Sequence, residues 1–197
     1  MRGVAAEHVI ELAQGLDARD AGAARHCETV ARYAWTIARE LGLPSQACKA
    51  IHLAGLLHDV GKIGIAIEIL SKQGPLDEAE WVVIQDHPRV GAEIVGGVGL
   101  HHLCDWVHSH HERPDGSGYP RGLSSAEIPV EAKILAVADS YEAMTNDRIY
   151  REAISHDLAV EELQRNCGTQ FDEAVVEAFL SVLERKAPMA EEPVGAV

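Results

Sequence analysis

The amino-acid sequence predicts an all-α protein on three observations. Apolar residues recur in steps of three and four along most of the 197 residues, strand-like alternation persists nowhere, and breakers such as Gly42 and Gly61 separate the periodic segments. A chain of this length can bury most of its apolar surface on folding, so we expect a single helical domain.

Two helices are predicted in the first third of the chain. Residues 25–43 carry an apolar stripe whose backward projection begins at His26. A second helix runs from about Ser45 to Val60 and ends on His58 and Asp59. Residues that can bind metals therefore lie at the start of the first helix, His26, and at the end of the second, His58 and Asp59.

A capping box and a proline indicate the next two helices. Asp77 followed by Glu80 is typical of a helix start, because each side chain can satisfy a backbone N–H of the first turn. Pro88 suits the first turn of a following helix, which places His87 at the junction between the two.

A histidine pair ends the helix predicted over residues 100–111. His110 shares an apolar face of this helix, and His111 follows it directly. Residues 114–122, rich in glycine and proline, then have the composition of a loop.

Three helices complete the predicted bundle. Residues 131–145 carry Asp139 within an apolar stripe, where a lone carboxylate would be costly to bury. Helices over 157–166 and 172–185 follow. We expect residues 1–19 to form an N-terminal helix or connector, residues 20–186 the domain, and residues 187–197 a disordered tail.

Composition argues against several classes of protein. A formal net charge of -14, from 31 acids and 17 bases, disfavours binding to DNA or RNA, which depends mainly on neutralising phosphates. The four cysteines lie far apart without a CxxC pair, which fits reduced thiols in the cytoplasm. No apolar run reaches the length of a membrane span, and the N-terminus is unlike a signal peptide. We expect a cytoplasmic protein without membrane insertion.

The polar residues at inward-facing positions form a candidate metal cluster. Its members are His26, His58, Asp59, His87, His110, His111 and Asp139. A single histidine on an apolar face is more often a hydrogen-bonded core residue, but several together with two aspartates favour a shared cation. Neighbours on a helix diverge by about 100°. His58 and Asp59 could thus address different metals or different sides of one centre, as could His110 and His111.

Five motifs in this order resemble the HD-GYP domain family: His26, HDVGK at 58–62, His87-Pro88, HHERPDGSGYP at 110–120, and ADSYEAMTNDRIYR at 138–151. The resemblance covers about Asp17 to Leu183 and implies an all-helical bundle of the HD-domain type. It also implies a metal-dependent phosphodiesterase that hydrolyses cyclic di-GMP to linear pGpG, usually with iron and sometimes with manganese.

The same resemblance implies a ligand set for two metals. His26, His58, Asp59 and Asp139 would hold one ion, and Asp59, His87, His110 and His111 the other, so that Asp59 bridges them. Mixed imidazole and carboxylate ligands with open positions fit iron or manganese better than a closed structural zinc site. Two ions roughly 3.5 to 4 Å apart would share a deprotonated water that attacks phosphorus.

Three basic residues acquire roles from the resemblance. Lys62, one helical turn beyond His58, would contact the metal-bound phosphate and act as a catalytic residue beside Asp59. Arg148 and Arg151 would contact substrate phosphate or guanine. From the residues alone, Lys62 could be a solvated lysine and the two arginines a salt-bridged helix edge.

The loop GSGYP would contact substrate and partners. Gly116 and Gly118 permit close backbone approach, and Tyr119 offers a stacking face and a hydroxyl. A purely structural turn is the alternative for the glycines. The neighbouring residues Glu112, Arg113 and Asp115 are expected to orient the metal ligands.

Three departures from the family pattern bear on activity. Gly22 stands where some members carry a glutamate that supports a third metal, so we expect two metals and a product that remains pGpG. Residues 64–67 read GIAI where GIPD is common, and Ile149 replaces the proline of DRPYR. These changes flank the pocket and bear on substrate affinity and turnover.

Two alternatives to the cyclic di-GMP phosphodiesterase stay open. One is an HD-type phosphohydrolase acting on another nucleotide, such as a cyclic GMP-AMP dinucleotide. The other is a catalytically weak sensor or adaptor that binds a cyclic dinucleotide. The partners considered are cyclic di-GMP, diguanylate cyclase (GGDEF) domains docking at the GYP loop, and a second copy in a homodimer.

Overall fold

The computed structural model describes residues 22–147 and 152–185, and in this part of the chain helices are connected by turns and loops without any strand. The predictions for residues 1–19 and 187–197 lie outside the described residues. The helices are α2 (Ala23–Glu40), α3 (Ser45–Leu57), η2 (Val60–Gly64), α4 (Ile67–Leu70), α5 (Glu78–Gln85), α6 (His87–Gly97), η3 (His101–Leu103), α7 (Cys104–Ser109), α8 (Val130–Thr145), α9 (His156–Arg165) and α10 (Glu173–Glu184). The predicted all-α class is confirmed.

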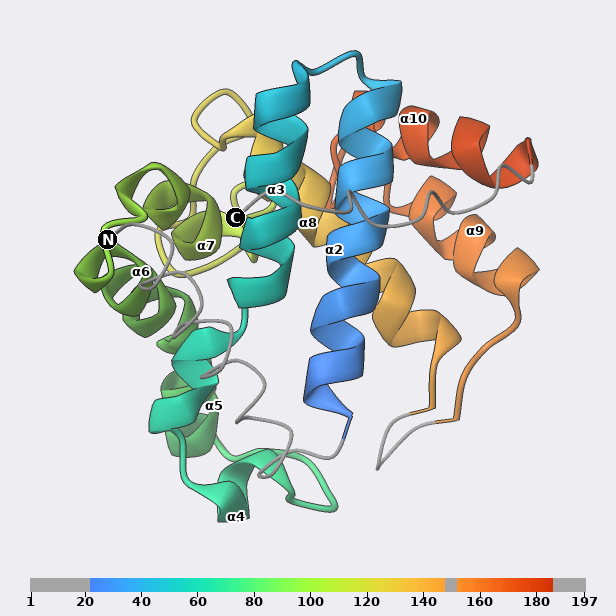
Figure 1. Ribbon diagram of the computed structural model, residues 1–197. Coiled ribbons are helices and arrows are strands. Elements are labelled where there is room, and N and C mark those ends of the chain that lie inside the picture. Colours follow the sequence, from blue (N-terminus) through green and yellow to red (C-terminus); the bar gives the residue numbers. More distant parts are fainter. Residues whose placement is uncertain (1–21, 148–151, 186–197) are drawn as a thin grey trace.

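The first two helices form an antiparallel pair that packs on α8 (Figure 1). The stripe predicted for α2 is buried, with Val30, Ala34 and Ile37 fully inaccessible to solvent. The first helical turn carries His26, also buried, at the same end of the pair where α3 ends. The pairing of α2 with α3 thus brings residues from two distant motifs to one place.

Helix α8 is the central helix of the bundle. Residues on most of its sides are buried, from Ala132 and Leu135 to Tyr141 and Met144, as expected for a helix covered by neighbours rather than lying on the surface. α2, α7, α9 and α10 all contact it. Its polar residue Asp139 therefore faces the interior of the bundle.

The last two helices cover the side of the bundle away from α6 and α7 (Figure 1). Ser155 accepts a hydrogen bond from the first turn of α9, and Asp172 does the same for α10, which explains where both helices begin. The buried ring of Phe179 packs edge-on against Tyr33 and Tyr141. This aromatic contact ties α10 to α2 and α8.

The second predicted helix ends earlier than expected. α3 stops at Leu57, His58 is its C-cap, and the chain tightens into the 3-10 helix η2 after Asp59. A side chain at Gly61 would place its Cβ 2.0 Å from the carbonyl oxygen of His87, so only glycine allows η2 to lie against α6. This close contact places the α3–η2 junction beside the start of α6.

The predicted helix over residues 100–111 is also divided. Residues His101–Leu103 form the 3-10 helix η3, in which Leu103 N–H bonds to the carbonyl of Leu100, and α7 begins only at Cys104. α7 ends at Ser109, so His110 caps it and His111 lies beyond it. The capping box of Asp77 and Glu80 at the start of α5 is present as predicted.

Candidate metal centre

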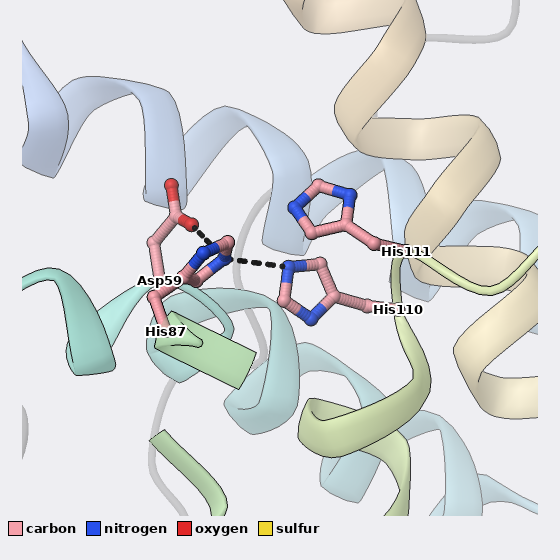
Figure 2. A group of neighbouring side chains, drawn as sticks. All are labelled: Asp59, His87, His110 and His111. Carbon is pink, nitrogen blue, oxygen red and sulfur yellow. Dashed lines mark hydrogen bonds and ion pairs between the residues drawn. The ribbon is translucent and has the colours of Figure 1, made fainter. Parts of the chain in front are cut away.

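The seven predicted ligands come from five parts of the chain and meet at one end of α2 and α3. His26 lies in α2, His58 and Asp59 follow α3, His87 opens α6, the pair His110–His111 follows α7, and Asp139 lies in α8. Their potential ligand atoms form two groups within 4.8 Å of one another, one of Asp59, His87, His110 and His111, and one of His26, His58 and Asp59. Figure 2 shows the first group, whose side chains point toward one another.

Asp59 belongs to both groups, because its two carboxylate oxygens face different histidines. The Oδ2 atom lies 3.7 Å from Nε2 of His26 and 3.5 Å from Nε2 of His58. The Oδ1 atom lies 3.3 Å from Nε2 of His87 on the other side (Figure 2). Asp59 therefore has the arrangement of a carboxylate that can bridge two cations.

Three of the histidines present the same nitrogen to the cluster. The Nδ1 atoms of His58, His87 and His110 are hydrogen-bonded to backbone carbonyls of Gly55, Ile84 and Val107, respectively. A carbonyl only accepts, so each Nδ1 carries the proton and each Nε2 is left with a lone pair. The chain has thus fixed the tautomer that binds metals through Nε2.

Within the described part of the chain, no donor pairs with the lone pairs of these histidines. Nε2 of His87 and Nε2 of His110 lie 3.4 Å apart, an unfavourable contact between two acceptors (Figure 2). Among the described residues, the buried atoms Nε2 of His58 and Oδ1 of Asp59 have no hydrogen-bond partner. Buried acceptors without donors are costly. One or more cations would satisfy all four atoms.

His26 is held between two carboxylates of α8. Its Nε2 lies 3.2 Å from Oδ1 of Asp139, and Asp139 also approaches Nε2 of His58 at 4.0 Å. On the other side of the ring, Nδ1 of His26 donates to the buried carboxylate of Glu142. Glu142 thus orients His26 so that Nε2 points at Asp59 and Asp139.

Glu142 is the functional candidate that sequence reasoning missed. The signal was present, since Glu142 lies three residues after Asp139 and therefore on the same side of α8. Its partner His26 is 116 positions away in the chain, and nothing local indicates that pairing.

Protonation states in the cluster suit a cation. Burial lowers the pKa of His111 to about 3 and also lowers the pKa values of His58 and His110. Burial alone would raise the pKa of Asp59, but Lys62 and the neighbouring histidines hold it well below its usual range. Neutral imidazoles beside an ionised carboxylate are the forms that bind metals.

His26 differs from the other histidines because carboxylates surround it. Burial opposes its charged form, yet hydrogen bonds with Asp139 and Glu142 outweigh burial and raise its pKa to about 9. The pKa of Asp139 is correspondingly held well below its usual range, against the effect of burial, chiefly by His26. Without metal, a proton on His26 therefore supplies part of the positive charge in this group.

Lys62 contacts the cluster directly. Its Nζ donates to Oδ2 of Asp59 at 2.6 Å from one turn along η2. The side chain is about a quarter exposed, at 24%, so the ammonium group lies at the mouth of the cluster. Arg148 and Arg151, the other predicted bases, lie outside the described residues.

The predicted GYP loop folds over the histidine pair. Gly116 has a φ of 77°, and a Cβ on Gly118 would lie 2.3 Å from the backbone nitrogen of Arg113. Both glycines therefore have a backbone role that no other residue could fill easily. The ring of Tyr119 lies 4.8 Å from that of His111, tilted by 30°. Tyr119 thus covers a potential metal ligand.

The residues expected to orient ligands stabilise the loop instead. The buried carboxylate of Glu112 accepts hydrogen bonds from the backbone N–H groups of Arg121 and Leu123, and Asp115 accepts from Ser117. Arg113 donates to the side chain of Gln170. Expecting these three side chains to hold the histidines was wrong, because backbone carbonyls and Glu142 do so.

Comparisons with known proteins identify the family. A family model described as "HD domain" matches residues 8–175, and the chain belongs to the HD domain family. RpfG of Xanthomonas campestris pv. campestris, a cyclic di-GMP phosphodiesterase response regulator, is 39% identical over 177 residues, which make up 88% of this chain and 47% of RpfG. The resemblance to HD-GYP proteins is thereby confirmed.

Two further matches come from other bacteria. The 3'3'-cGAMP-specific phosphodiesterase 1 of Vibrio cholerae is 42% identical over 147 residues, 73% of this chain and 34% of that protein. The solved structure of Bd1817, an HDG"Y"P protein of Bdellovibrio bacteriovorus, has a TM-score of 0.67 at 18% identity, covering 93% of this chain and 62% of that chain. The structural match supports the helical HD-domain fold.

The chain spans less than half the length of these two curated relatives. Among the described helices, none combines the length and the apolar composition needed to cross a bilayer.

Proposed function

We propose that this protein is a metal-dependent phosphodiesterase that hydrolyses cyclic di-GMP to linear pGpG. The observation that carries the proposal is the position of Asp59, whose two oxygens face separate groups of histidines. The similarity to RpfG, a cyclic di-GMP phosphodiesterase, supports the substrate class.

The residues present fit two metal ions with Asp59 between them. We assign His26, His58, Asp59 and Asp139 to one ion, and Asp59, His87, His110 and His111 to the other. The orphaned Nε2 of His58 and Oδ1 of Asp59 support this assignment. When bound, two ions of iron or manganese would polarise a phosphoryl oxygen and lower the pKa of a water.

The remaining residues bind and orient the substrate. Lys62 donates to a phosphate oxygen, for which its contact with Asp59 at the mouth of the cluster places it well. Tyr119 packs over His111 and presents its ring to the substrate, and Gly116 and Gly118 hold the loop in place. Arg148 and Arg151 are assigned to substrate phosphate or guanine by family resemblance.

We propose that pGpG is the final product and is not cleaved further. The family resemblance assigns a third metal to members with a glutamate four residues before the first histidine, and this chain has Gly22 there. Gly22 is the N-cap of α2 and brings no ligand atom to the cluster.

A second candidate function is hydrolysis of a cyclic GMP-AMP dinucleotide. It is favoured by the 42% identity with a 3'3'-cGAMP-specific phosphodiesterase, which is as high as the identity with RpfG. Both functions use the same cluster, so they differ only in how the bases are recognised.

We also propose a cytoplasmic location and two protein partners, a GGDEF domain and a second copy of this chain. A cytoplasmic location is supported by four cysteines that form no disulfide. Docking of a diguanylate cyclase (GGDEF) domain at the GYP loop is supported by the exposure of Ser117 and Pro120. Homodimerisation is supported by the exposed apolar side chains of α5, notably Trp81 and Val82.

Turnover by the parent and by Asp59→Ala tests the proposed function. Both proteins are reconstituted anaerobically with iron or manganese, incubated with cyclic di-GMP or 3'3'-cGAMP, and followed by chromatography of the products. We expect the parent to release pGpG and Asp59→Ala to be inactive. Tight binding without turnover by the fully loaded parent would instead support a sensor and contradict the phosphodiesterase.

A further inference from the structure

A groove of about 290 Å³ lies between α9 and the last turns of α10. Its apolar floor is formed by Val160, Leu180 and Leu183, each of which is only partly buried. A groove between two packed helices is complementary to the side-chain ridge of a third helix. Because α9 and α10 cover the side of the bundle away from α6 and α7, this groove is separate from the candidate metal centre (Figure 1).

The walls of the groove are held in place by the rest of the bundle. His156, which lines it, is hydrogen-bonded through Nδ1 to the hydroxyl of Tyr141 in α8. Ala159 and Leu163 of α9 and Phe179 of α10 are buried and anchor the two helices. A preformed surface loses less conformational entropy on binding than one that must first become ordered.

Three exposed carboxylates form the rim of the groove, those of Asp157 and Glu161 in α9 and of Glu184 in α10. Glu184 is the last residue of its helix, where the negative end of the helix dipole disfavours an anion. The three negative charges also repel one another around a small apolar surface. A cation on this rim would offset both effects.

The chain supplies no arginine or lysine for this rim in the part that the structure describes. Arg165, at the end of α9, pairs with Glu162, and Arg185, directly after α10, pairs with Glu40. The rim carboxylates themselves form no ion pair within residues 22–147 and 152–185. They are therefore available to the cations of a partner.

We propose that this groove is a docking site for a basic amphipathic helix of a protein partner. Apolar side chains on one face of that helix occupy the floor, and lysines or arginines beside them pair with the rim. This is the helix-in-groove mode of recognition, in which anchors recur at three- and four-residue steps. The acidic rim disfavours a nucleic acid or an anionic membrane at the same place, because it repels phosphates.

Fluorescence anisotropy with a designed peptide tests the proposal. The probe is a fluorescein-labelled peptide in which leucine and lysine repeat with the period of an amphipathic helix, titrated with the parent in EDTA at physiological ionic strength. A second peptide of the same composition alternates leucine and lysine, so it presents no apolar helical face. We expect saturable binding of the helical peptide and binding weaker by about tenfold or more for the alternating one, which loses the burial of leucines in the floor.

Variants of the rim and of the floor locate the binding site. For Glu161→Lys and Glu184→Lys we expect a loss of about tenfold or more, because like charges then face each other across the interface. Glu28→Lys makes the same change in net charge at an exposed position of α2, and screening should keep its effect within about twofold. Val160→Thr places a hydroxyl in the floor and should weaken binding by about threefold or more. Circular dichroism establishes that each variant remains helical.

The proposal is overturned if the helical peptide does not bind, if the alternating peptide binds equally, or if Glu161→Lys keeps the parent's affinity. It is also overturned if Glu28→Lys weakens binding as much as Glu161→Lys, since this indicates diffuse attraction by net charge. Sedimentation velocity of the parent without peptide examines another occupant. Self-association that is lost in Glu161→Lys would place a second copy of this chain in the groove and contradict the proposal.

The outcome does not depend on the proposed function. The titration contains neither metal nor substrate, and the groove is separate from the candidate metal centre. A parent that hydrolyses cyclic di-GMP but does not bind the helical peptide refutes only the docking site. A parent that binds the peptide at the groove but hydrolyses no cyclic dinucleotide refutes only the phosphodiesterase.

Discussion

A single carboxylate, that of Glu142, orients one imidazole of the proposed metal centre. Most of its histidines are fixed by backbone carbonyls, but His26 depends on the side chain of Glu142. A carboxylate that accepts from a ligating histidine fixes its tautomer and makes the other nitrogen a better ligand.

Replacing Glu142 should therefore weaken metal binding without unfolding the protein. For Glu142→Gln we expect affinity for manganese to fall roughly 10- to 100-fold, the range typical of lost partners of ligating histidines. A competition titration against a chromophoric chelator measures this. Glu177→Gln, on an exposed position of α10, is the matched control. Unchanged affinity in Glu142→Gln would show that His26 needs no such partner.

The predicted ligands could be found from the sequence because each lies on a recognisable motif. His58 and Asp59, for example, stand together at the end of an apolar helix. Glu142 and the pair of Arg113 with Gln170 could not be found in this way. Their partners lie 116 and 57 positions away, and only the packed bundle brings them together.

Short elements were harder to predict than long ones. The long helices α2 and α8 follow their apolar periodicity, whereas α3 ends at Leu57 rather than near Val60, and η3 lies inside a segment predicted as α-helix. A 3-10 turn has nearly the same local pattern as an α-turn. Where a 3-10 turn replaces an α-turn depends on tertiary contacts, such as that between Gly61 and the backbone of His87, and these contacts are not visible in the local sequence.

The contact between η2 and α6 should be sensitive to a single methyl group. Gly61→Ala places a Cβ 2.0 Å from the His87 carbonyl oxygen, so we expect a loss of about 1–3 kcal/mol or more in the free energy of unfolding. Chemical denaturation of the metal-free protein measures it. Gly64→Ala, in the same 3-10 helix but with open space around it, should have little effect. Equal losses in both variants would exclude crowding against α6 as the cause.

Across the whole molecule, the proposed metal centre brings together elements that are far apart in the sequence. Its proposed ligands come from α2, α6, α8 and the chain after α3 and α7. Cations bound there would link the paired helices α2 and α3 to α6 and to the central helix α8. Binding at this position should therefore contribute to global stability.

Removal of metal should destabilise the folded chain. A ligand at 100 times its dissociation constant stabilises by about 2.7 kcal/mol per site, so manganese should raise the midpoint of thermal unfolding and EDTA should lower it. Differential scanning calorimetry with and without EDTA measures the shift. In Asp59→Ala the shift should be largely lost. An equal shift in parent and variant would place the stabilising ion elsewhere.

The metal content of the folded chain tests the central claim most directly. After anaerobic reconstitution with iron or manganese and removal of unbound ions, elemental analysis should find two ions per chain in the parent and fewer in Asp59→Ala. A parent that retains one ion or none would contradict a centre in which Asp59 joins two cations.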